Sequence, residues 1–347
     1  MAMSCRGWRG NVTWLKIGIF LVICGIGYRY VVHVNLHCFS QSSPAFGRKP
    51  QMIATNTVDI ELQKIANDPV ISYLMVKNLY LNHTKMASMT SCNLDVHLIT
   101  SFPMLYTPTT LKNGGLDNVK FRRQLEYLET LYNNVQHPCV AGIHIFADKD
   151  LPIYLNQQRV VNFSPLKHKL KFKELSRSPN MSELWTYAWT NLPQRIVAIA
   201  NADIFIGGGL EKIDGDRMKT KHIAFSITRQ PHPAVWLNDS SLCVEDSQNF
   251  CDTYKGSHDF HMMYMDKPFP RGVIRALEFQ MNSLGAENVL IHMWQKKLNL
   301  TVLNPCKTVT IVHNHCSGHR TYSDKRVDRI HGWLIGRVKG SDKLDTK

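Results

Sequence analysis

The chain has 347 residues, of which 44% are hydrophobic, and it carries 41 Lys and Arg against 27 Asp and Glu, a net charge of +14. This length allows two or three folded units, and the hydrophobic fraction is enough for a sizeable core. The positive charge suits an anionic substrate or surface, but no arginine-rich run or aromatic–basic motif occurs, which argues against a nucleic-acid partner.

The first part of the chain predicts a membrane anchor. Residues 17–28 carry no charge, and the apolar segment Trp14–Val34 would be about 31 Å long as a helix, enough to span a bilayer. Basic residues come before this segment, so the positive-inside rule places the N-terminus in the cytosol and the rest in the lumen. A cleaved signal peptide is the alternative, although no clear small-x-small cleavage site follows.

These features divide the chain into five expected parts. They are a cytosolic tail over 1–16, a transmembrane signal anchor over 17–34, a stem over 35–91, a lumenal domain over 92–335 and a C-terminal tail over 336–347.

Glycosylation sequons support exposure to the lumen. Asn-x-Ser/Thr sequences begin at Asn82, Asn162, Asn180, Asn238 and Asn299. Such sites are modified in proteins that pass through the secretory pathway.

The cysteines support an oxidising compartment. Nine are present, and six lie beyond the predicted stem, at Cys92, Cys139, Cys243, Cys251, Cys306 and Cys316. Six cysteines allow 15 pairings. The pairs closest in sequence are our first expectation, namely Cys243–Cys251 and Cys306–Cys316, which leaves Cys92–Cys139. Buried free thiols are the alternative, and the absence of Cys-x-x-Cys argues against a zinc ribbon.

From residue 92 onward, strand and helix patterns alternate. Strands are predicted over 95–102, 140–146, 196–200, 221–228, 259–265 and 308–313, and helices over 119–135, 182–190 and 287–298. A strand–helix–strand order implies a parallel sheet with crossover helices. We therefore expect an α/β fold with a mixed, mainly parallel sheet flanked by helices.

The stretch Arg195–Ile206 organises this pattern. Its apolar run Ile196–Ala200 predicts a fully buried strand, which then delivers Asn201 and Asp203. In an open α/β sheet ligands bind at the carboxyl ends of the strands. A carboxylate there can hold a divalent metal, and the metal can hold a diphosphate. The alternative is that both side chains only cap a turn.

Further polar motifs follow other strands or open a helix. They read Asn201-Ala-Asp-Ile204, Ser257-His-Asp259, Gly285-Ala-Glu-Asn288 and His313-Asn-His-Cys-Ser-Gly-His-Arg320. Taken together and in this order, they resemble the GT-A nucleotide-sugar glycosyltransferases, and more closely a group with an Asn-x-Asp-Ile strand end and a closing His-x-His-x-Ser-Gly-x-Arg. The resemblance covers about residues 92–322. It implies a Golgi type II enzyme that moves a sugar from a nucleotide-sugar donor to a glycan, glycoprotein or glycolipid acceptor.

The resemblance also implies roles at the donor side of the site. Asp203 matches the last acid of the Asp-x-Asp motif, which holds Mn²⁺ or Mg²⁺ against the donor diphosphate, while Asn201 stands in place of the first acid. His315, or His313, matches the histidine that completes the metal site. The charge of the leaving diphosphate would be neutralised by the metal together with Arg229 or Arg320.

At the acceptor side, the resemblance points to a catalytic base. Gly285–Asn288 is similar to the Gly-Gly-Glu-Asp helix start that carries the base of inverting members. The base position falls on Asn288, which cannot act as a base, so Glu287 one residue earlier is our expectation. Asp259 is the other candidate carboxylate.

Two other functions fit parts of the sequence. A Golgi sulfotransferase shares the topology, but it needs a phosphosulfate loop after the first strand, and Ser101-Phe-Pro-Met-Leu-Tyr106 lacks one. A catalytically inactive lumenal binding protein is kept open by Asn201 and Asn288. Each site residue also has a structural alternative: Glu287 as only a partner of the helix dipole, His313 and His315 as ordinary strand residues, and Arg229 as a surface or salt-bridged residue.

Overall fold

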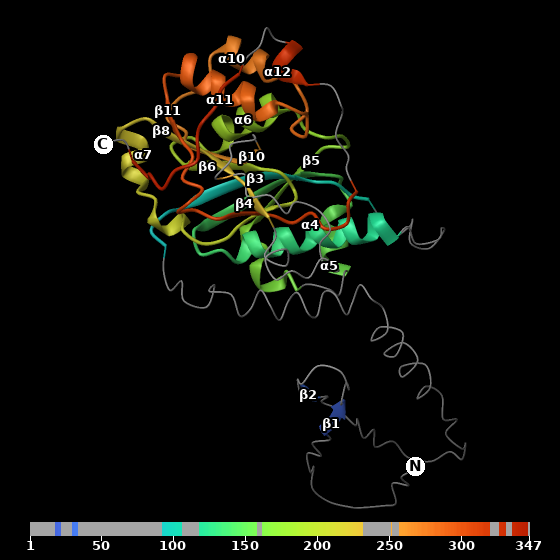
Figure 1. Cartoon of the computed structure of the whole chain (residues 1–347). Helices are drawn as coiled ribbons and strands as arrows, with labels where there is room; N and C mark the ends of the chain where they lie inside the picture. Colours follow the sequence, from blue (N-terminus) through green and yellow to red (C-terminus); the bar gives the residue numbers. More distant parts are fainter. Residues whose placement is uncertain are drawn as a thin grey trace, which may run out of the picture. The chain divides into compact units, whose positions relative to one another are not determined.

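The computed structural model (Figure 1) describes residues 18–21, 30–33, 92–105, 118–157, 162–231, 251, 257–319, 326–330 and 335–345. The chain divides into two compact units, Met1–Ile60 and Glu61–Lys347.

In the first unit, strands β1 Gly18–Leu21 and β2 Tyr30–His33 pair antiparallel. The helix predicted over 17–34 is therefore not found at these residues. Glycine lowers helix propensity in this segment, and Val31 and Val32 favour extended backbone. Within the ranges given above, no helix is both long and apolar enough to cross a membrane.

A seven-stranded sheet forms the centre of the second unit, in the order β11-β8-β10-β6-β3-β4-β5. Its strands are β3 Val96–Phe102, β4 Val140–Ala147, β5 Leu170–Glu174, β6 Ile196–Ala200, β8 Ile223–Thr228, β10 His258–Tyr264 and β11 Thr301–Leu303. The four strands from β5 to β6 run parallel, and β11 runs parallel to β8, whereas β10 is antiparallel to both its neighbours. The predicted mixed, mainly parallel sheet is confirmed.

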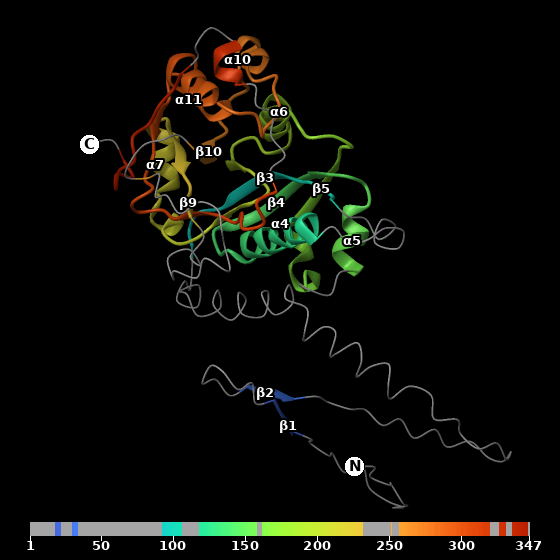
Figure 2. The same cartoon turned by 45° about the vertical axis from the view of Figure 1, so that its right-hand side comes forward.

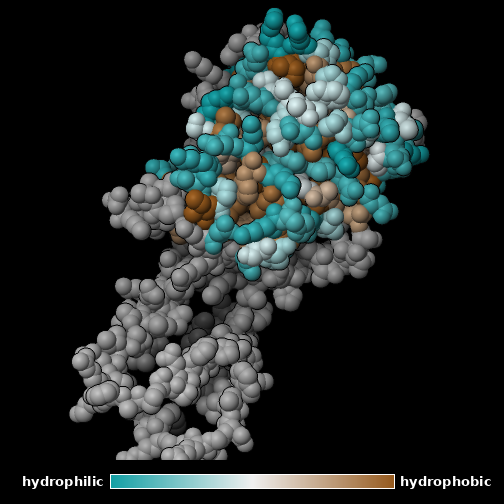
Figure 3. Space-filling view, turned by 180° about the vertical axis from the view of Figure 1, so that it is seen from behind, coloured by the Kyte–Doolittle hydropathy of each residue, from teal (hydrophilic) through white to brown (hydrophobic). Residues whose placement is uncertain are grey.

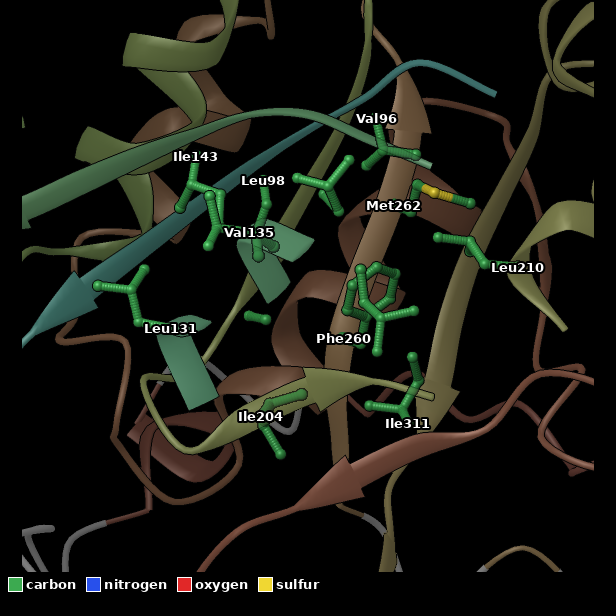
Figure 4. Packing of buried hydrophobic residues seen from close by; sticks show 14 of the residues in the cluster. Val96, Leu98, Leu131, Val135, Ile143, Ile204, Leu210, Phe260, Met262 and Ile311 are labelled. Carbon is green, nitrogen blue, oxygen red and sulfur yellow. The ribbon is translucent and has the colours of Figure 1, made fainter. Parts of the chain in front are cut away.

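Helices cover both faces of this sheet, as Figures 1 and 2 show. Helices α4 Asn118–Gln136 and α5 Leu151–Gln157 lie on one face, and α6 Met181–Asn191, α10 Arg271–Ala276 and α11 Ala286–Lys296 lie on the other. Strand side chains alternate between the two cores, so that Leu98 packs with the α4 side and Ile99 with the α6 and α11 side. Figure 4 shows Leu98 beside Val135 of α4.

The strand order creates a crevice at one edge of the sheet. The chain passes from β3 to β4 and β5 on one side, then returns to place β6 on the other side of β3. This reversal is the topological switch point, where open α/β sheets bind ligands beyond the carboxyl ends of the strands. Asp203 comes three residues after β6 ends.

A second, three-stranded sheet brings another polar segment to the same edge. It has the order β7-β12-β9, with β7 Ile204–Ile206, β12 Ile311–His313 and β9 Gln230–Pro231. Strands β6 and β7 belong to different sheets because a turn separates them, in which the Ile204 amide donates to the Asn201 carbonyl over 3.1 Å. Strand β12 pairs His313 with Ile204, which places His313 beside the turn.

The strand predicted over 308–313 begins only at Ile311. The amides of Thr308 and Val309 donate instead to the carbonyl of Pro305, in a turn over 2.9 and 2.8 Å. The remaining short elements are η2 Ser164–Lys169, η3 Leu210–Lys212, α7 Gly215–Thr220 and α12 Val327–Ile330.

Residues 335–345 run along the domain, although we expected a tail from residue 336. The Gly336 amide donates to the Asn288 carbonyl, and the Ser341 amide to the Asn304 carbonyl, each over 2.9 Å. Asp345 forms an ion pair with Arg217. This C-terminal segment is therefore part of the folded unit.

Two disulfides are described, and they correct the predicted pairing. Cys92 bonds to Cys139 as predicted, whereas Cys251 bonds to Cys306, so the predicted pairs Cys243–Cys251 and Cys306–Cys316 are wrong. Cys251 and Cys306 are buried in one hydrophobic cluster, so the core rather than sequence distance decides the partner. Cys316 is bonded to a cysteine outside the described residues.

The face of the molecule that Figure 3 shows is largely hydrophilic, with hydrophobic residues in small patches separated by hydrophilic ones. Among the described large hydrophobic residues, the exposed ones are Val119, Ile153, Phe172 and Ile335.

Candidate active site

A cleft of about 520 Å³ opens at the carboxyl ends of β3 and β6. It is lined by all the described residues that the sequence predicted for the site: Asn201, Asp203, Arg229, Asp259, Glu287, His313 and His315. Arg320 lies outside the described residues. Asn201 and His315, which are 114 positions apart in the sequence, therefore line the same cleft.

Asp203, His313 and His315 form a group that can hold a metal ion. All three are buried, and their ligand atoms lie within 4.8 Å of one another. His313 Nε2 is 3.2 Å, and His315 Nδ1 3.9 Å, from Oδ2 of Asp203. Two ligands bound about 2.1 Å from one cation at a right angle are about 3 Å apart, so this spacing fits. A carboxylate with two imidazoles suits Mn²⁺ or Zn²⁺ better than Mg²⁺.

Arg123 of helix α4 contacts the same carboxylate. Its Nη2 donates to Oδ2 of Asp203, and its side chain is buried. Burial alone would raise the pKa of Asp203, but Arg123 and then His313 lower it more, so this pKa is well below its usual value. Asp203 is thus a buried, ionised carboxylate with a fixed partner.

Glu126, one helical turn after Arg123, holds the segment that carries the two histidines. Its Oε1 accepts from the amides of Cys316 and Ser317 over 2.8 and 2.6 Å. Its Oε2 accepts from Arg123 and from the Ser317 hydroxyl. The backbone amide of Asn314, which lies between the two histidines in sequence, donates to the Asp203 carbonyl over 2.7 Å. Helix α4 therefore fixes the position of both histidines relative to Asp203.

Asp259 is held between two donors on the neighbouring strands. Asn201 Nδ2 donates to its Oδ1, and Arg229 Nη1 to its Oδ2, each over 3.2 Å. The Arg229 amide donates in turn to the carbonyl of Ser257, whose φ is +62°. The predicted Asn201, Arg229 and Asp259 form one network, and it leaves Asp259 fixed in orientation.

Glu287 opens helix α11 on another part of the cleft lining. Burial, with a smaller contribution from the charge of Asp259, raises its pKa to about 7. A carboxyl that titrates near neutral pH can exchange protons with a substrate hydroxyl.

The turn before Glu287 depends on Asp328 of α12. Asn288 Nδ2 donates to Oδ2 of Asp328 over 2.8 Å, and Arg326 donates to both carboxylate oxygens. Gly285 has a φ of +81°, and a Cβ there would lie 2.6 Å from Cγ of Asp328. Asn288, at the motif position of the base, is thus a structural residue that ties the helix start to α12.

The sequence did not reveal several residues of the cleft. They are Arg123, Tyr127, Arg326 and Arg337, with Asp328 behind them. Arg123 and Tyr127 fall within a helix recognised only by its apolar spacing. No local signal marks them, because charged and amide residues between the apolar positions of a helix are usually exposed to solvent.

Comparisons with known proteins give only distant likenesses. No family model and no curated protein matches the chain. The mannosyltransferase PcManGT of Pyrobaculum calidifontis, solved with GDP-Man and Mn²⁺, is 13% identical over 73% of this chain and 68% of its own, with a TM-score of 0.34. TarS 1-349 of S. aureus is 10% identical over 67% of this chain and 59% of its own, also at 0.34.

HddC of Yersinia pseudotuberculosis is 16% identical over 33% of this chain, with a TM-score of 0.21. The match spans 51% of HddC, about half its length. Scores this low do not establish a shared fold.

Proposed function

We propose that the chain is a glycosyltransferase that moves a sugar from a nucleotide-sugar donor to a hydroxyl of a glycan, glycoprotein or glycolipid. One observation carries this proposal. A possible metal-binding group, Asp203 with His313 and His315, shares a cleft at the sheet's switch point with Glu287, a carboxyl whose pKa is about 7. Sugar transfer can use both, because a bound cation stabilises the leaving diphosphate and a carboxylate can take the proton of the attacking hydroxyl.

On the donor side, Asp203, His313 and His315 would hold Mn²⁺, and a bound cation would neutralise charge on the leaving diphosphate. Arg229, Arg326 and Arg337 also line the cleft. The pairing of Arg229 with Asp259 gives it a fixed position, which favours preorganised binding of an anionic group. Arg320, proposed for the same role, belongs to the motif that contains both histidines.

On the acceptor side, Glu287 is the better candidate for the base. Its pKa of about 7 lets it accept a proton near neutral pH and release it afterwards. Asp259 already accepts from Asn201 and Arg229, so we assign it an orienting role. We therefore assign the base to Glu287 rather than to Asp259.

The two alternatives have less support. A sulfotransferase would need a phosphate-binding loop with Lys after β3, whereas Ser101 and Pro103 line the cleft there. An inactive binding protein would explain Asn201 and Asn288, but both amides have bonding roles that do not require loss of activity.

We also propose that the enzyme works in the Golgi as a single-pass type II membrane protein with its catalytic domain in the lumen. The disulfides favour an oxidising compartment, and Asn299 is exposed, as glycan attachment requires. The anchor over 17–34 rests on hydropathy and charge alone, since β1 and β2 lend it no support. Carbonate extraction of membranes and glycosidase treatment would test both points; an unglycosylated cytosolic protein would exclude them.

The activity is tested by donor hydrolysis and transfer over a panel of sugar nucleotides, with Mn²⁺, with Mg²⁺ and with a chelator. We expect turnover of at least one donor that is lost in Glu287→Gln. Glu278→Gln is the matched control, because Glu278 is an exposed glutamate nine positions earlier. Donor binding without turnover would favour the binding protein, and turnover of a phosphosulfate would favour the sulfotransferase.

A further inference from the structure

We propose that Arg123 is a fixed counter-ion of Asp203, the carboxylate of the metal-binding group. Its positive charge keeps a divalent cation weakly bound until an anionic ligand binds together with the cation. The identity of that ligand, a nucleoside diphosphate, rests on the proposed function. The effect of Arg123 on cation affinity does not depend on the proposed function.

The guanidinium of Arg123 lies beside the metal-binding group. Nη2 of Arg123 contacts Oδ2 of Asp203, the same oxygen from which His313 Nε2 and His315 Nδ1 lie 3.2 and 3.9 Å away. The Arg123 and Asp203 side chains are only 6% and 12% exposed, so solvent screens their charges little. A cation held by these three ligands would therefore lie next to a fixed positive charge.

Buried hydrogen bonds hold Arg123 in this position. Its Nη1 donates to Glu126 Oε2 over 2.8 Å and to the Asn314 carbonyl over 3.3 Å, and its Nε donates to the Tyr127 hydroxyl over 3.0 Å. Glu126 is held in turn by the amides of Cys316 and Ser317. Moving the guanidinium away would break this buried network, so Arg123 stays beside Asp203 when a cation arrives.

The charges nearest the metal position also favour a joint anion. Asp203 and Arg123, which are in direct contact, sum to zero with neutral histidines, so a divalent cation alone leaves this pair at +2, while the buried carboxylates of Glu126 and Glu129 lie one step further away, on Arg123 and Asn314. A diphosphate in the same cleft supplies negative charge beside both the cation and Arg123, which lines the cleft. Each ligand then favours the other, and this coupling must be reciprocal. The arrangement would keep the metal site weak in the absence of donor.

The test is Mn²⁺ affinity of the purified full chain, measured by electron paramagnetic resonance of free Mn²⁺, alone and with saturating GDP or UDP. We expect Arg123→Gln to bind Mn²⁺ alone at least about tenfold more tightly, because a charge next to the ligand atom is removed. The added diphosphate should tighten Mn²⁺ binding less in this variant than in the parent. Arg122→Gln is the matched control, since Arg122 is the exposed neighbour on α4.

A second variant guards against misfolding. Arg123→Met with Glu126→Gln removes both charges of that pair, so Glu126 is not left as a buried carboxylate without its cation, and this variant should also bind Mn²⁺ alone more tightly than the parent. Asp203→Asn, added to either Arg123 variant, should abolish this gain in Mn²⁺ affinity. The proposal is overturned if both Arg123 variants bind Mn²⁺ no better than Arg122→Gln, or if the gain survives Asp203→Asn. Failure of the parent to bind any nucleoside diphosphate would instead contradict the proposed function.

Discussion

Asn201 donates a hydrogen bond from Nδ2 to Oδ1 of Asp259 over 3.2 Å and so connects the end of β6 with the start of β10. Arg229 reaches the other oxygen of the same carboxylate. The motif resemblance places an acid at position 201, yet the geometry needs a donor there. The hydrogen bond to Asp259 explains why an amide side chain stands at position 201. Asn201 is therefore no evidence that a metal site has been lost.

We therefore predict that Asn201→Asp destabilises the protein at pH 8. Two carboxylates would replace a hydrogen-bonded pair, and the free energy of unfolding should fall by about 1–3 kcal/mol. The loss should shrink at pH 5, where one of the two carboxyls can take up a proton. Chemical denaturation at both pH values measures it. Asn201→Asp with Asp259→Asn restores one donor and one acceptor and should recover most of the stability; equal losses in both variants would contradict the explanation.

Glu287 gives a second prediction. A folded-state pKa of about 7, raised from 4.5 by burial, means that the native state binds the proton more tightly than the unfolded state. Stability contributed by this group therefore falls as pH rises from about 4.5 to 7. Glu287→Gln should stabilise the protein above pH 7, by at most about 3 kcal/mol, and have no effect on stability below pH 4.5.

The same group sets the pH dependence of turnover. Parent activity should rise with an apparent pKa near 7, because the ionised carboxylate is the proposed base. Pairing pH-dependent denaturation with a pH–rate profile separates the two effects. If Glu287→Gln is less stable than the parent at pH 8, or keeps parental turnover, the assignment is wrong.

Much of the sheet could be predicted from the sequence because its strands have local signatures. The apolar runs of β3, β4 and β6 are buried on both faces, and α4 shows helical apolar spacing. The edge strands β5 and β11 were missed. Lys171, Lys173 and Glu174 make β5 a mostly exposed strand, and only its pairing with β4 makes it extended.

The sequence predicted the site residues that follow a strand or begin a helix. It missed the residues that helix α4 contributes from the middle of its length. Helix α4 lies between the main sheet and the segments of β7 and β12, so it is buried on more than one side. Asn134 shows the consequence, since its side chain accepts from the Ile206 amide and donates to the Ile204 carbonyl. Arg123 is buried for the same reason. No local pattern distinguishes such a residue from a solvated one.

The buried histidines give a third prediction. His144 of β4 lies between His97 Nδ1 and the Tyr187 hydroxyl, at 3.2 and 3.0 Å, and burial lowers its pKa to about 4. Its unfolded pKa is 6.5, so stability is present above pH 6.5 and is lost as pH falls toward 4. At pH 5.5 the loss from this group should be about 1.4 kcal/mol relative to pH 8.

The measurement is urea denaturation of the parent and His144→Gln at pH 8 and pH 5.5. The variant should lose less stability between the two pH values, even if it is less stable at both. His168→Gln is the control, because His168 is an exposed histidine in η2. An identical pH dependence in the parent and His144→Gln would exclude this role.

Gly285 provides the sharpest structural prediction, because it links backbone conformation to the base. Its φ is +81°, and a Cβ would lie 2.6 Å from both Cγ and Oδ1 of Asp328. Gly285→Ala therefore adds the cost of a left-handed conformation to an overlap with a buried carboxylate, about 2–4 kcal/mol together. Gly272→Ala is the matched control, since no atom lies within 4 Å of a Cβ there.

A double-mutant cycle separates the two costs of Gly285→Ala. In an Asp328→Ala background the overlap is gone, so Gly285→Ala should cost only about 1–2 kcal/mol, the left-handed part alone. Turnover should fall in Gly285→Ala beyond what lost stability explains, because Glu287 lies two residues further along the same helix start. Denaturation midpoints and kcat of the folded variants test this directly. If Gly285→Ala costs the same with and without Asp328, the carboxylate does not hold this turn, and the link between α12 and the base is refuted.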